Sequence, residues 1–288
     1  MTGERMNGKI LTLQQIYREG KETLERAGIA EAGLDAWYLL EYVTGISRAS
    51  YYGDPGRVVT EEDLCRYREC IEKRAGHIPL QHITGEQEFM GLSFRVNDQV
   101  LIPRQDTETL VEEVLKYAMP GMRVLDLCTG SGCILISLLH FCPGLTGVGS
   151  DISAEALKMA RTNGQRLHVE DRAQWLCGDL FEKVTGAFDL IVSNPPYIRS
   201  AEIEELQEEV RLYDPRIALD GAEDGLLFYR RIIEESKSYL KNGGRLLFEI
   251  GCDQGRDVAE LLENAGYTEV SVKKDLAGLD RVAAGRLQ

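Results

Sequence analysis

The sequence lacks the features that would place it in a membrane or on a nucleic acid. Its 288 residues contain no apolar run of ~18 residues, and Glu4, Arg5 and Lys9 interrupt the N-terminus where a secretion signal would lie. Lys and Arg number 33 against 47 Asp and Glu, a formal charge of −14. A protein that binds the phosphate backbone of a nucleic acid needs clustered Lys and Arg residues, and this sequence has no such cluster. We therefore expect a cytoplasmic protein whose partner is a small molecule or another protein.

Cysteine and histidine patterns typical of metal sites are also missing. The seven cysteines include no Cys-x-x-Cys pair, and the four histidines show no paired ligand spacing. Cys128 and Cys133 flank a glycine loop, but no His adjoins either of them in the sequence to activate its thiol. We expect reduced thiols, no metal, and no nucleophilic role for either cysteine.

The chain length and the pattern of its first residues predict two domains, the first of them helical. A length of 288 residues fits about two domains of the usual size. Residues 1–77 read as a helical domain. Residues 12–15 (Thr-Leu-Gln-Gln) have the form of a capping box, a second helix is expected over 34–43 before Gly45, and Thr60 begins a third. Their apolar stripes predict an ordinary bundle core.

A linker with a different pattern follows. Residues 78–103 form short extended pieces that are interrupted at Gly85 and Gly91. This pattern predicts a β-hairpin with arms over 89–96 and 100–102.

Residues 104–288 alternate strand-like runs with helical ones. This alternation predicts an α/β domain in which helices cover a parallel sheet. The expected strands are 123–127, 145–150, 174–176, 188–193 and 245–250, with a last pair near 269–272 and 280–284. The expected helices are 134–141, 154–163, 226–240 and 257–265.

A glycine turn follows the first of these strands. Small residues there let the backbone approach a ligand closely at the carboxyl end of the strand. Leu135 stands where a dinucleotide fingerprint would carry its third glycine, which argues against a dehydrogenase. The residues of the turn are Cys128, Thr129, Gly130, Ser131 and Gly132.

Acidic residues at the ends of three successive strands or directly after them indicate that this loop belongs to a nucleoside site. Asp151 ends the second strand, where its carboxylate can accept hydrogen bonds from both hydroxyls of a ribose. An adenosyl ligand without phosphates, such as S-adenosylmethionine, needs no Lys in the loop. Asp126 is expected to bind its positively charged end through water or the Thr129 region. Asp179 is expected either to read the adenine amino group, with Leu180 packed on the ring, or to be a turn or capping residue.

A tetrapeptide directly behind the strand 188–193 predicts the reaction. Two prolines remove two backbone donors and leave carbonyl oxygens exposed. An incoming NH2 group can then donate to the Asn194 side-chain oxygen and to the Pro195 carbonyl, while Tyr197 packs on the planar group. The alternative is a rigid Asn-Pro turn. The tetrapeptide consists of Asn194, Pro195, Pro196 and Tyr197.

With these motifs in place, the chain resembles the HemK-type methyltransferases, which methylate the glutamine side-chain amide of peptide chain release factors. The resemblance covers nearly all of the chain. It is carried by residues 79–85 (Pro-Leu-Gln-His-Ile-Thr-Gly), 88–92 (Glu-Phe-Met-Gly-Leu), 100–108 (Val-Leu-Ile-Pro-Arg-Gln-Asp-Thr-Glu), 126–132, 194–197 and 280–282 (Asp-Arg-Val).

The resemblance implies a Rossmann-like methyltransferase domain that uses S-adenosylmethionine. It implies transfer of a methyl group to N5 of the glutamine in the Gly-Gly-Gln motif of class I release factors, in translation termination. Residues 128–132 and Asp151 would hold the cofactor, and residues 194–197 would hold the acceptor glutamine. The helical domain 1–77 would recognise the protein substrate.

The sequence departs from the family pattern at few positions. The family often has Gly at Cys128, Pro-Glu at residues 105–106 and an aromatic residue at Leu180. These departures bear on adenine stacking and on the contacts of the segment, not on the chemistry. Arg104 and Glu108 are open between ligand contacts and structural partners.

Two other functions compete with this reading. One is an amino-methyltransferase that acts on a base of DNA or RNA, which the acidic charge and the absence of a basic segment oppose. The other is a non-catalytic S-adenosylmethionine-binding adaptor. Loss of Asn194 or Asp151 would favour the adaptor, and both residues are present.

Overall fold

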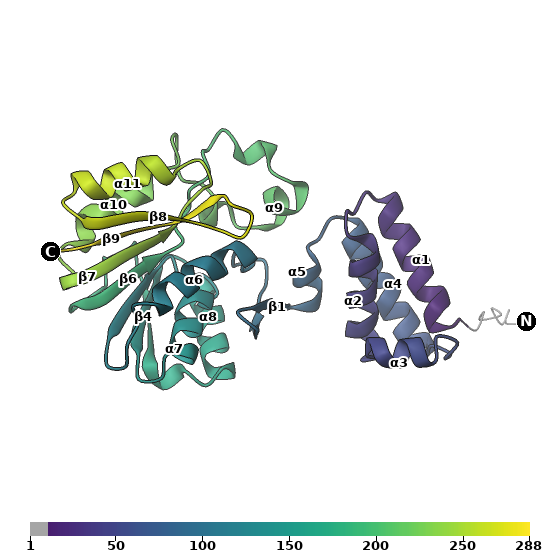
Figure 1. Ribbon diagram of the computed structural model, residues 1–288. Helices are drawn as coiled ribbons and strands as arrows, with labels where there is room; N and C mark the ends of the chain where they lie inside the picture. The colour runs from purple at the N-terminus through teal and green to yellow at the C-terminus, as the bar shows by residue number, and fades with distance from the viewer. Residues whose placement is uncertain (1–10) are drawn as a thin grey trace, which may run out of the picture. The chain divides into compact units, whose positions relative to one another are not determined.

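The computed structural model describes residues 11–288, which divide into two compact units (Figure 1). The first unit ends at Thr84 and the second begins at Gly85. Among the described residues, no helix is both long enough and apolar enough to cross a membrane.

The first unit is helical, as the sequence predicts. The capping box is confirmed, because Thr12 N–H donates to Gln15 Oε1 at 2.9 Å and Gln15 N–H donates to Thr12 Oγ1 at 3.4 Å. Gly45 ends the second helix in a left-handed conformation, and Thr60 caps the fourth. The sequence reading missed the third and fifth helices, which are short. The helices are α1 (Leu13–Arg26), α2 (Ala32–Thr44), α3 (Arg48–Gly53), α4 (Glu61–Ala75) and α5 (Leu80–Thr84).

Tyr67 of α4 ties the three long helices together. Its ring lies over Gly20 of α1, where an added Cβ would come within 2.2 Å of the Tyr67 hydroxyl oxygen. The same hydroxyl donates to the Ala36 carbonyl of α2 at 3.1 Å. A buried ion pair, Arg74 Nε to Asp35 Oδ2 at 2.6 Å, joins α2 to α4 a second time. The close packing of α1 against α4 therefore depends on a glycine at position 20, which has no side chain.

The second unit opens with a hairpin that differs from the predicted one. Its strands are β1 (Glu86–Phe89) and β2 (Leu92–Arg95), and the predicted arm 100–102 is not a strand. The turn is Met90–Gly91, with φ of +53° and +69°. Two left-handed residues in succession give the turn twist that a two-residue hairpin needs. The Glu108 carboxylate accepts a hydrogen bond from the Met90 N–H at 2.5 Å and so holds the turn, which gives Glu108 a structural partner.

A seven-stranded, mostly parallel sheet forms the centre of this unit and confirms the α/β class. The strand order is β5-β4-β3-β6-β7-β9-β8, and only the pairs that involve β9 are antiparallel. The chain turns back at β3, which lies between β4 and β6, so a crevice is expected beyond the carboxyl ends of β3 and β6. The strands are β3 (Arg123–Leu127), β4 (Thr146–Asp151), β5 (Ala173–Cys177), β6 (Phe188–Ser193), β7 (Leu240–Glu249), β8 (Thr268–Lys274) and β9 (Asp280–Arg286).

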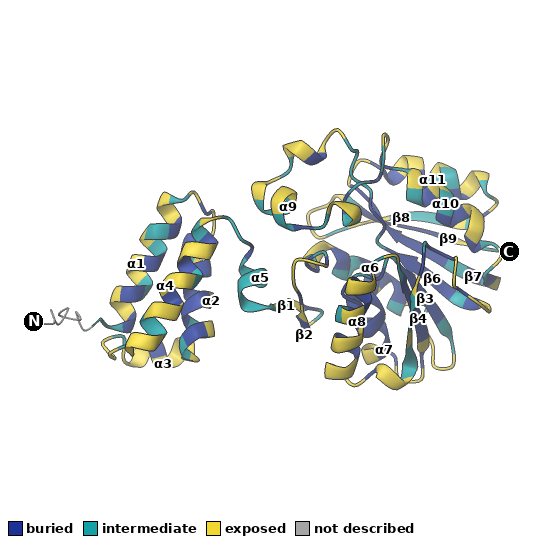
Figure 2. Cartoon of the chain, turned by 180° about the vertical axis from the view of Figure 1, so that it is seen from behind, coloured by how far each residue is buried: buried dark blue, intermediate teal, exposed yellow. Residues whose placement is uncertain are grey.

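Helices cover both faces of the sheet. Neighbouring residues Val124 and Leu125 of β3 belong to different apolar clusters, because successive side chains of a strand point to opposite faces. Figure 1 shows α6, α7 and α8 on one side of the strands and α10 and α11 on the other, and Figure 2 shows buried strands beneath helices with exposed outer faces. The helices are α6 (Glu108–Leu115), α7 (Cys133–Phe141), α8 (Ala154–Arg166), α9 (Glu208–Tyr213), α10 (Leu227–Ser236) and α11 (Gly255–Asn264).

Replacement of Gly20 by alanine tests the packing of the helical unit. We expect Gly20→Ala to lower the free energy of unfolding by about 1–3 kcal/mol, because the new methyl group displaces the Tyr67 ring. Gly33→Ala in α2 is the control, since its Cβ would meet nothing closer than 3.6 Å. Thermal denaturation of both variants measures the difference, and equal stability of the two would contradict the packing role.

Candidate active site

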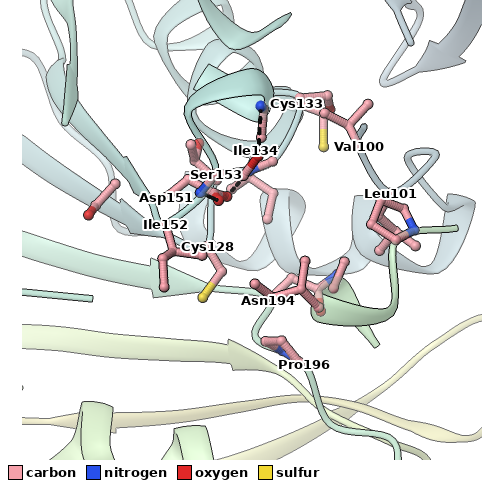
Figure 3. Close-up of a pocket in the computed structure, with 18 of the residues that line it drawn as sticks. Val100, Leu101, Cys128, Cys133, Ile134, Asp151, Ile152, Ser153, Asn194 and Pro196 are labelled. Atoms are coloured by element: carbon pink, nitrogen blue, oxygen red, sulfur yellow. Dashed lines mark hydrogen bonds between the residues drawn. The ribbon is translucent and has the colours of Figure 1, made fainter. Parts of the chain in front are cut away.

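A cavity of about 240 Å³ lies at the carboxyl ends of β3, β4 and β6. Its wall comes from the loops that follow these strands and β5, from the segment before α6, and from α10. Figure 3 shows Asp151 and Ser153 on one side, Asn194 and Pro196 on another, and Cys128 between them. Most of the predicted cofactor residues therefore line one cavity together with two residues of the predicted acceptor site, Asn194 and Pro196.

Asp151 is oriented by backbone donors at both of its carboxylate oxygens. Gly130 N–H donates to Oδ2 at 2.8 Å, and Ser153 N–H donates to Oδ1 at 2.9 Å. Burial raises the pKa of Asp151, and these N–H groups oppose the rise. Each oxygen retains a lone pair, so the carboxylate can accept two further hydrogen bonds, as the two hydroxyls of a ribose require.

The two glycines of the loop have different roles. Gly130 lines the cavity with φ of +54°, and an added Cβ would project into open space. Its missing side chain leaves room for a ligand. Gly132 is not part of the cavity wall, because its α-carbon faces Ile136 and Trp175, within 3.0 Å of an added Cβ. The predicted ligand contact is thus supported for Gly130, while Gly132 allows α7 to pack against the sheet.

Asp126 lies behind the loop and not on the cavity wall. The sequence predicts that it binds the charged end of the cofactor, but its side chain is fully buried and its Oδ2 accepts a hydrogen bond from Thr129 Oγ1 at 2.6 Å. Burial raises the pKa of Asp126 to about 7. Thr129 lines the cavity together with Ser131, so the expected route from Asp126 to a ligand through the Thr129 region is available, and the contact stays a prediction.

Both cysteines near the loop line the cavity as thiols. Cys128 has φ of +58°, the left-handed conformation that favours the glycine of the family pattern. Burial raises the pKa of Cys128 well above its usual range and raises that of Cys133 to about 12. Neither side chain is a thiolate near neutral pH, which fits the expectation that neither acts as a nucleophile.

Asp179 and Leu180 lie together on the cavity wall, after β5. Asp179 Oδ2 accepts a hydrogen bond from the Arg231 guanidinium at 2.7 Å, and Arg231 itself lines the cavity. Leu180 has φ of +49°, and its carbonyl accepts a hydrogen bond from Ser150 Oγ at 2.8 Å. Their position supports a role beside a ligand ring, with Arg231 as a further wall residue that the sequence reading missed.

The tetrapeptide after β6 divides into residues that line the cavity and residues that support it. Asn194 and Pro196 line the cavity, whereas Pro195 and Tyr197 do not. The Tyr197 hydroxyl donates to Glu249 Oε1 at 3.3 Å, and burial raises the pKa of Tyr197. The Tyr197 ring is partly buried and packs against the apolar cluster on the α10 side of the sheet, so its packing on the acceptor group stays a prediction.

Comparisons with known proteins agree with this geometry. Residues 15–85 match the PrmC N-terminal domain, and residues 105–211 match the methyltransferase small domain. A release factor glutamine methyltransferase of Caulobacter vibrioides is 42% identical over 279 residues, 96% of each chain. One of Clostridium acetobutylicum is 44% identical over 253 residues, 86% of this chain and 89% of that one.

The chain belongs to the release factor glutamine methyltransferase family. A solved methyltransferase of Pyrococcus furiosus is 18% identical with a TM-score of 0.50, covers 69% of this chain and 90% of its own, and shows the fold alone.

Three residues that sequence reading missed hold the tetrapeptide of this family member from behind. An added Cβ at Gly221 would lie 2.8 Å from the Tyr197 α-carbon, and one at Gly225 would lie 2.4 Å from the Tyr197 carbonyl oxygen. The Gln254 side chain is buried and donates to that carbonyl at 3.0 Å. The spacing of two glycines in an acidic loop was a signal for close approach, but the sequence does not show that the segment they approach is the tetrapeptide.

Arg104, which sequence reading left open, fixes the rim of the cavity. Its guanidinium contacts Asp214 Oδ2 at 2.5 Å, and Asp214 is buried. Arg104 and the residues directly after Asp214, Pro215 and Ile217, all line the cavity. The ion pair therefore ties the loop between β6 and α10 to the segment before α6, which favours a structural role for Arg104.

Asp151→Asn is expected to weaken S-adenosylmethionine binding about 10- to 100-fold, because hydrogen bonds to a charged acceptor are worth ~1.5–3 kcal/mol. Asparagine keeps the size of the side chain and removes its charge. Calorimetry of the variant, beside the exposed control Glu155→Gln, measures the change. An unchanged dissociation constant in a folded Asp151→Asn protein would remove this residue from the cofactor site.

Proposed function

We propose that the chain transfers a methyl group from S-adenosylmethionine to N5 of the glutamine in the Gly-Gly-Gln motif of class I peptide chain release factors. The observation that carries the proposal is the shared cavity, which joins the oriented carboxylate of Asp151 to Asn194 and Pro196 of the tetrapeptide. Relatives that carry this activity in their names match nearly the whole chain. A cytoplasmic location and a protein partner fit the acidic composition.

The residues present fit the cofactor. Gly130 leaves open space beside the loop, and Asp151 has one lone pair free at each oxygen. Asp179 and Leu180 line the same cavity and would hold the adenine ring. When bound, S-adenosylmethionine supplies an electrophilic methyl group on a sulfonium.

The task of the tetrapeptide is to orient a weak nucleophile. An amide nitrogen attacks poorly because its lone pair is delocalised into the carbonyl. A hydrogen bond from its NH2 group to the Asn194 side-chain oxygen on the cavity wall, with the Pro195 carbonyl as the second acceptor that the sequence predicts, would aim the nitrogen at the methyl group. Correct orientation is worth ~7–11 kcal/mol over free encounter. The same acceptors stabilise the positive charge that grows on nitrogen. As the new N–C bond forms, the C–S bond breaks and one amide proton leaves to water, so no titrating general base is assigned.

A three-substrate assay tests the function. Labelled S-adenosylmethionine is incubated with a release factor, with free glutamine and with DNA, and mass spectrometry locates the methyl group. We expect label on the release factor glutamine alone. Label on DNA would favour the base-methylating alternative, and no label on any substrate would favour the adaptor.

Asn194→Ala is expected to lower turnover about 10²- to 10⁴-fold while leaving most of the cofactor affinity intact, because Asn194 orients the acceptor and not the cofactor. Asn242→Ala, at an exposed position in β7, is the matched control. Turnover is measured with cofactor and release factor both saturating. A near-normal rate for Asn194→Ala would refute the amide-methyltransferase mechanism.

Removal of the helical unit tests the proposal that this unit recognises the protein substrate. A shortened chain that begins at Gly85 should bind S-adenosylmethionine within about threefold of the full chain, since the whole cavity wall lies in residues 99–231. Its kcat/KM should fall for an intact release factor but not for a short Gly-Gly-Gln peptide. An equal kcat/KM for the intact factor would assign the helical unit another role.

A further inference from the structure

The side-chain amide of Asn194 has one end bound within the protein. Its Nδ2 donates to Thr107 Oγ1 at 3.4 Å. An amide that donates from its nitrogen on one side presents its oxygen on the other. Because Asn194 also lines the cavity, this bond decides whether an oxygen or an NH2 group faces an incoming substrate. Only the oxygen can accept from the NH2 group of a glutamine.

Thr107 holds Asn194 in this orientation only while the Thr107 hydroxyl accepts the hydrogen bond from Asn194 Nδ2. Thr107 is the residue directly before α6, is 2% exposed, and makes no capping hydrogen bond with its side chain. Its hydroxyl has one proton and can donate it to one partner only. If that proton went to Asn194, the Asn194 oxygen would turn inward. A second partner must therefore accept the hydrogen bond that the Thr107 hydroxyl donates.

Glu249, the last residue of β7, is that partner. Its side chain is 2% exposed, and Oε1 accepts the hydrogen bond from Tyr197. Oε2 is fully buried and accepts no hydrogen bond from the described residues in this conformation. The Thr107 hydroxyl lies close enough to the carboxyl to lower the pKa of Glu249. A carboxylate can only accept, so a hydrogen bond between these two groups must have Thr107 as its donor, and Thr107 then accepts from Asn194.

We propose that Glu249, acting through Thr107, is a positioning residue that holds the Asn194 side-chain oxygen toward the acceptor amide. The proposal rests on the proposed function, because it concerns the acceptor half of the same site. The two residues form a relay from β7 to the tetrapeptide: Glu249 orients the Thr107 hydroxyl, and the hydroxyl orients Asn194. Tyr197, on the other carboxylate oxygen, fixes the position of Glu249.

The charge state of Glu249 decides which groups donate and which accept the hydrogen bonds of the relay. Burial raises the pKa of Glu249 to about 7, against the opposing effects of Thr107, Arg281 and Tyr197, and Asp106 adds to the rise. Cys133 and Tyr229 also face the carboxyl, and both titrate far above neutral pH. A protonated Glu249 can donate to Thr107, which then donates to Asn194 and turns its NH2 group to the cavity. Turnover should therefore be high above pH 7 and fall below it.

Two variants of Thr107 test the relay without changing the charge. Thr107→Val keeps the shape and removes the hydroxyl, and Thr107→Ser keeps the hydroxyl. We expect Thr107→Val to lower kcat about 10- to 100-fold with an unchanged S-adenosylmethionine dissociation constant, and Thr107→Ser to stay within about threefold of the unaltered chain. A kcat for Thr107→Val within threefold, or equal losses in both variants, would overturn the proposal.

Glu249→Gln tests the carboxylate. The kcat of the unaltered chain, with both substrates saturating, should rise through about pH 7, and the rise should be missing in Glu249→Gln. Asp126 has a similar pKa and remains in the variant, so the difference between the two profiles reports Glu249. Glu263→Gln, at an exposed position of α11, should keep the original profile. Identical profiles for the Glu249→Gln variant and the unaltered chain would overturn the relay.

The combined variant separates a relay from two independent effects. If Glu249 acts through Thr107, Thr107→Val with Glu249→Gln should be no slower than Thr107→Val alone, and multiplied losses would overturn the link. The proposed function fails separately: an unaltered chain that methylates no release factor refutes the function, whereas an active chain whose Thr107→Val variant is equally active refutes only the relay.

Discussion

The pairing of β3 between β4 and β6 is the constraint on which the site depends. Leu127 of β3 lies beside Ser150 on one side and Ser193 on the other, and Ser193 Oγ donates to the Leu127 carbonyl at 2.8 Å. The three strands therefore end at one level, and the residues that follow them meet at one edge. A one-residue slip of β6 would send the side chains of this strand to the opposite faces and remove Asn194 from the edge.

Four residues at this edge are in states that are unfavourable by themselves. Cys128 and Leu180 are both left-handed, at a cost of ~1–2 kcal/mol each for a residue with a side chain. Asp126 and Glu249 are buried carboxyl groups whose pKa values are raised to about 7. All four lie on or directly behind the cavity wall. A strained backbone and buried carboxyl groups at this edge indicate that it is shaped to bind ligands, while the rest of the sheet stabilises the fold.

The sequence predicted those parts of the structure that depend on local patterns. The bounds of β3 and β6 were predicted correctly, because each is a continuous apolar run between polar turns. The hairpin was misplaced because Met90 is an unusual residue for a left-handed turn position and depends on Glu108, 18 residues away. The supports of the tetrapeptide were missed for the same reason: Glu249 is 52 residues from Tyr197 and joins it only through the sheet.

The tetrapeptide cannot orient its own side-chain amide. Its two prolines fix the backbone and remove donors, but they leave rotation about the Asn194 side chain free. The groups that restrict this rotation come from the start of α6 and the end of β7, which the order of the sheet brings to β6. A chain that kept the four residues but lost Thr107 would still offer the acceptor carbonyls and the cofactor loop. It would bind both substrates, but the two orientations of the Asn194 amide would compete, and turnover would fall while affinity remained.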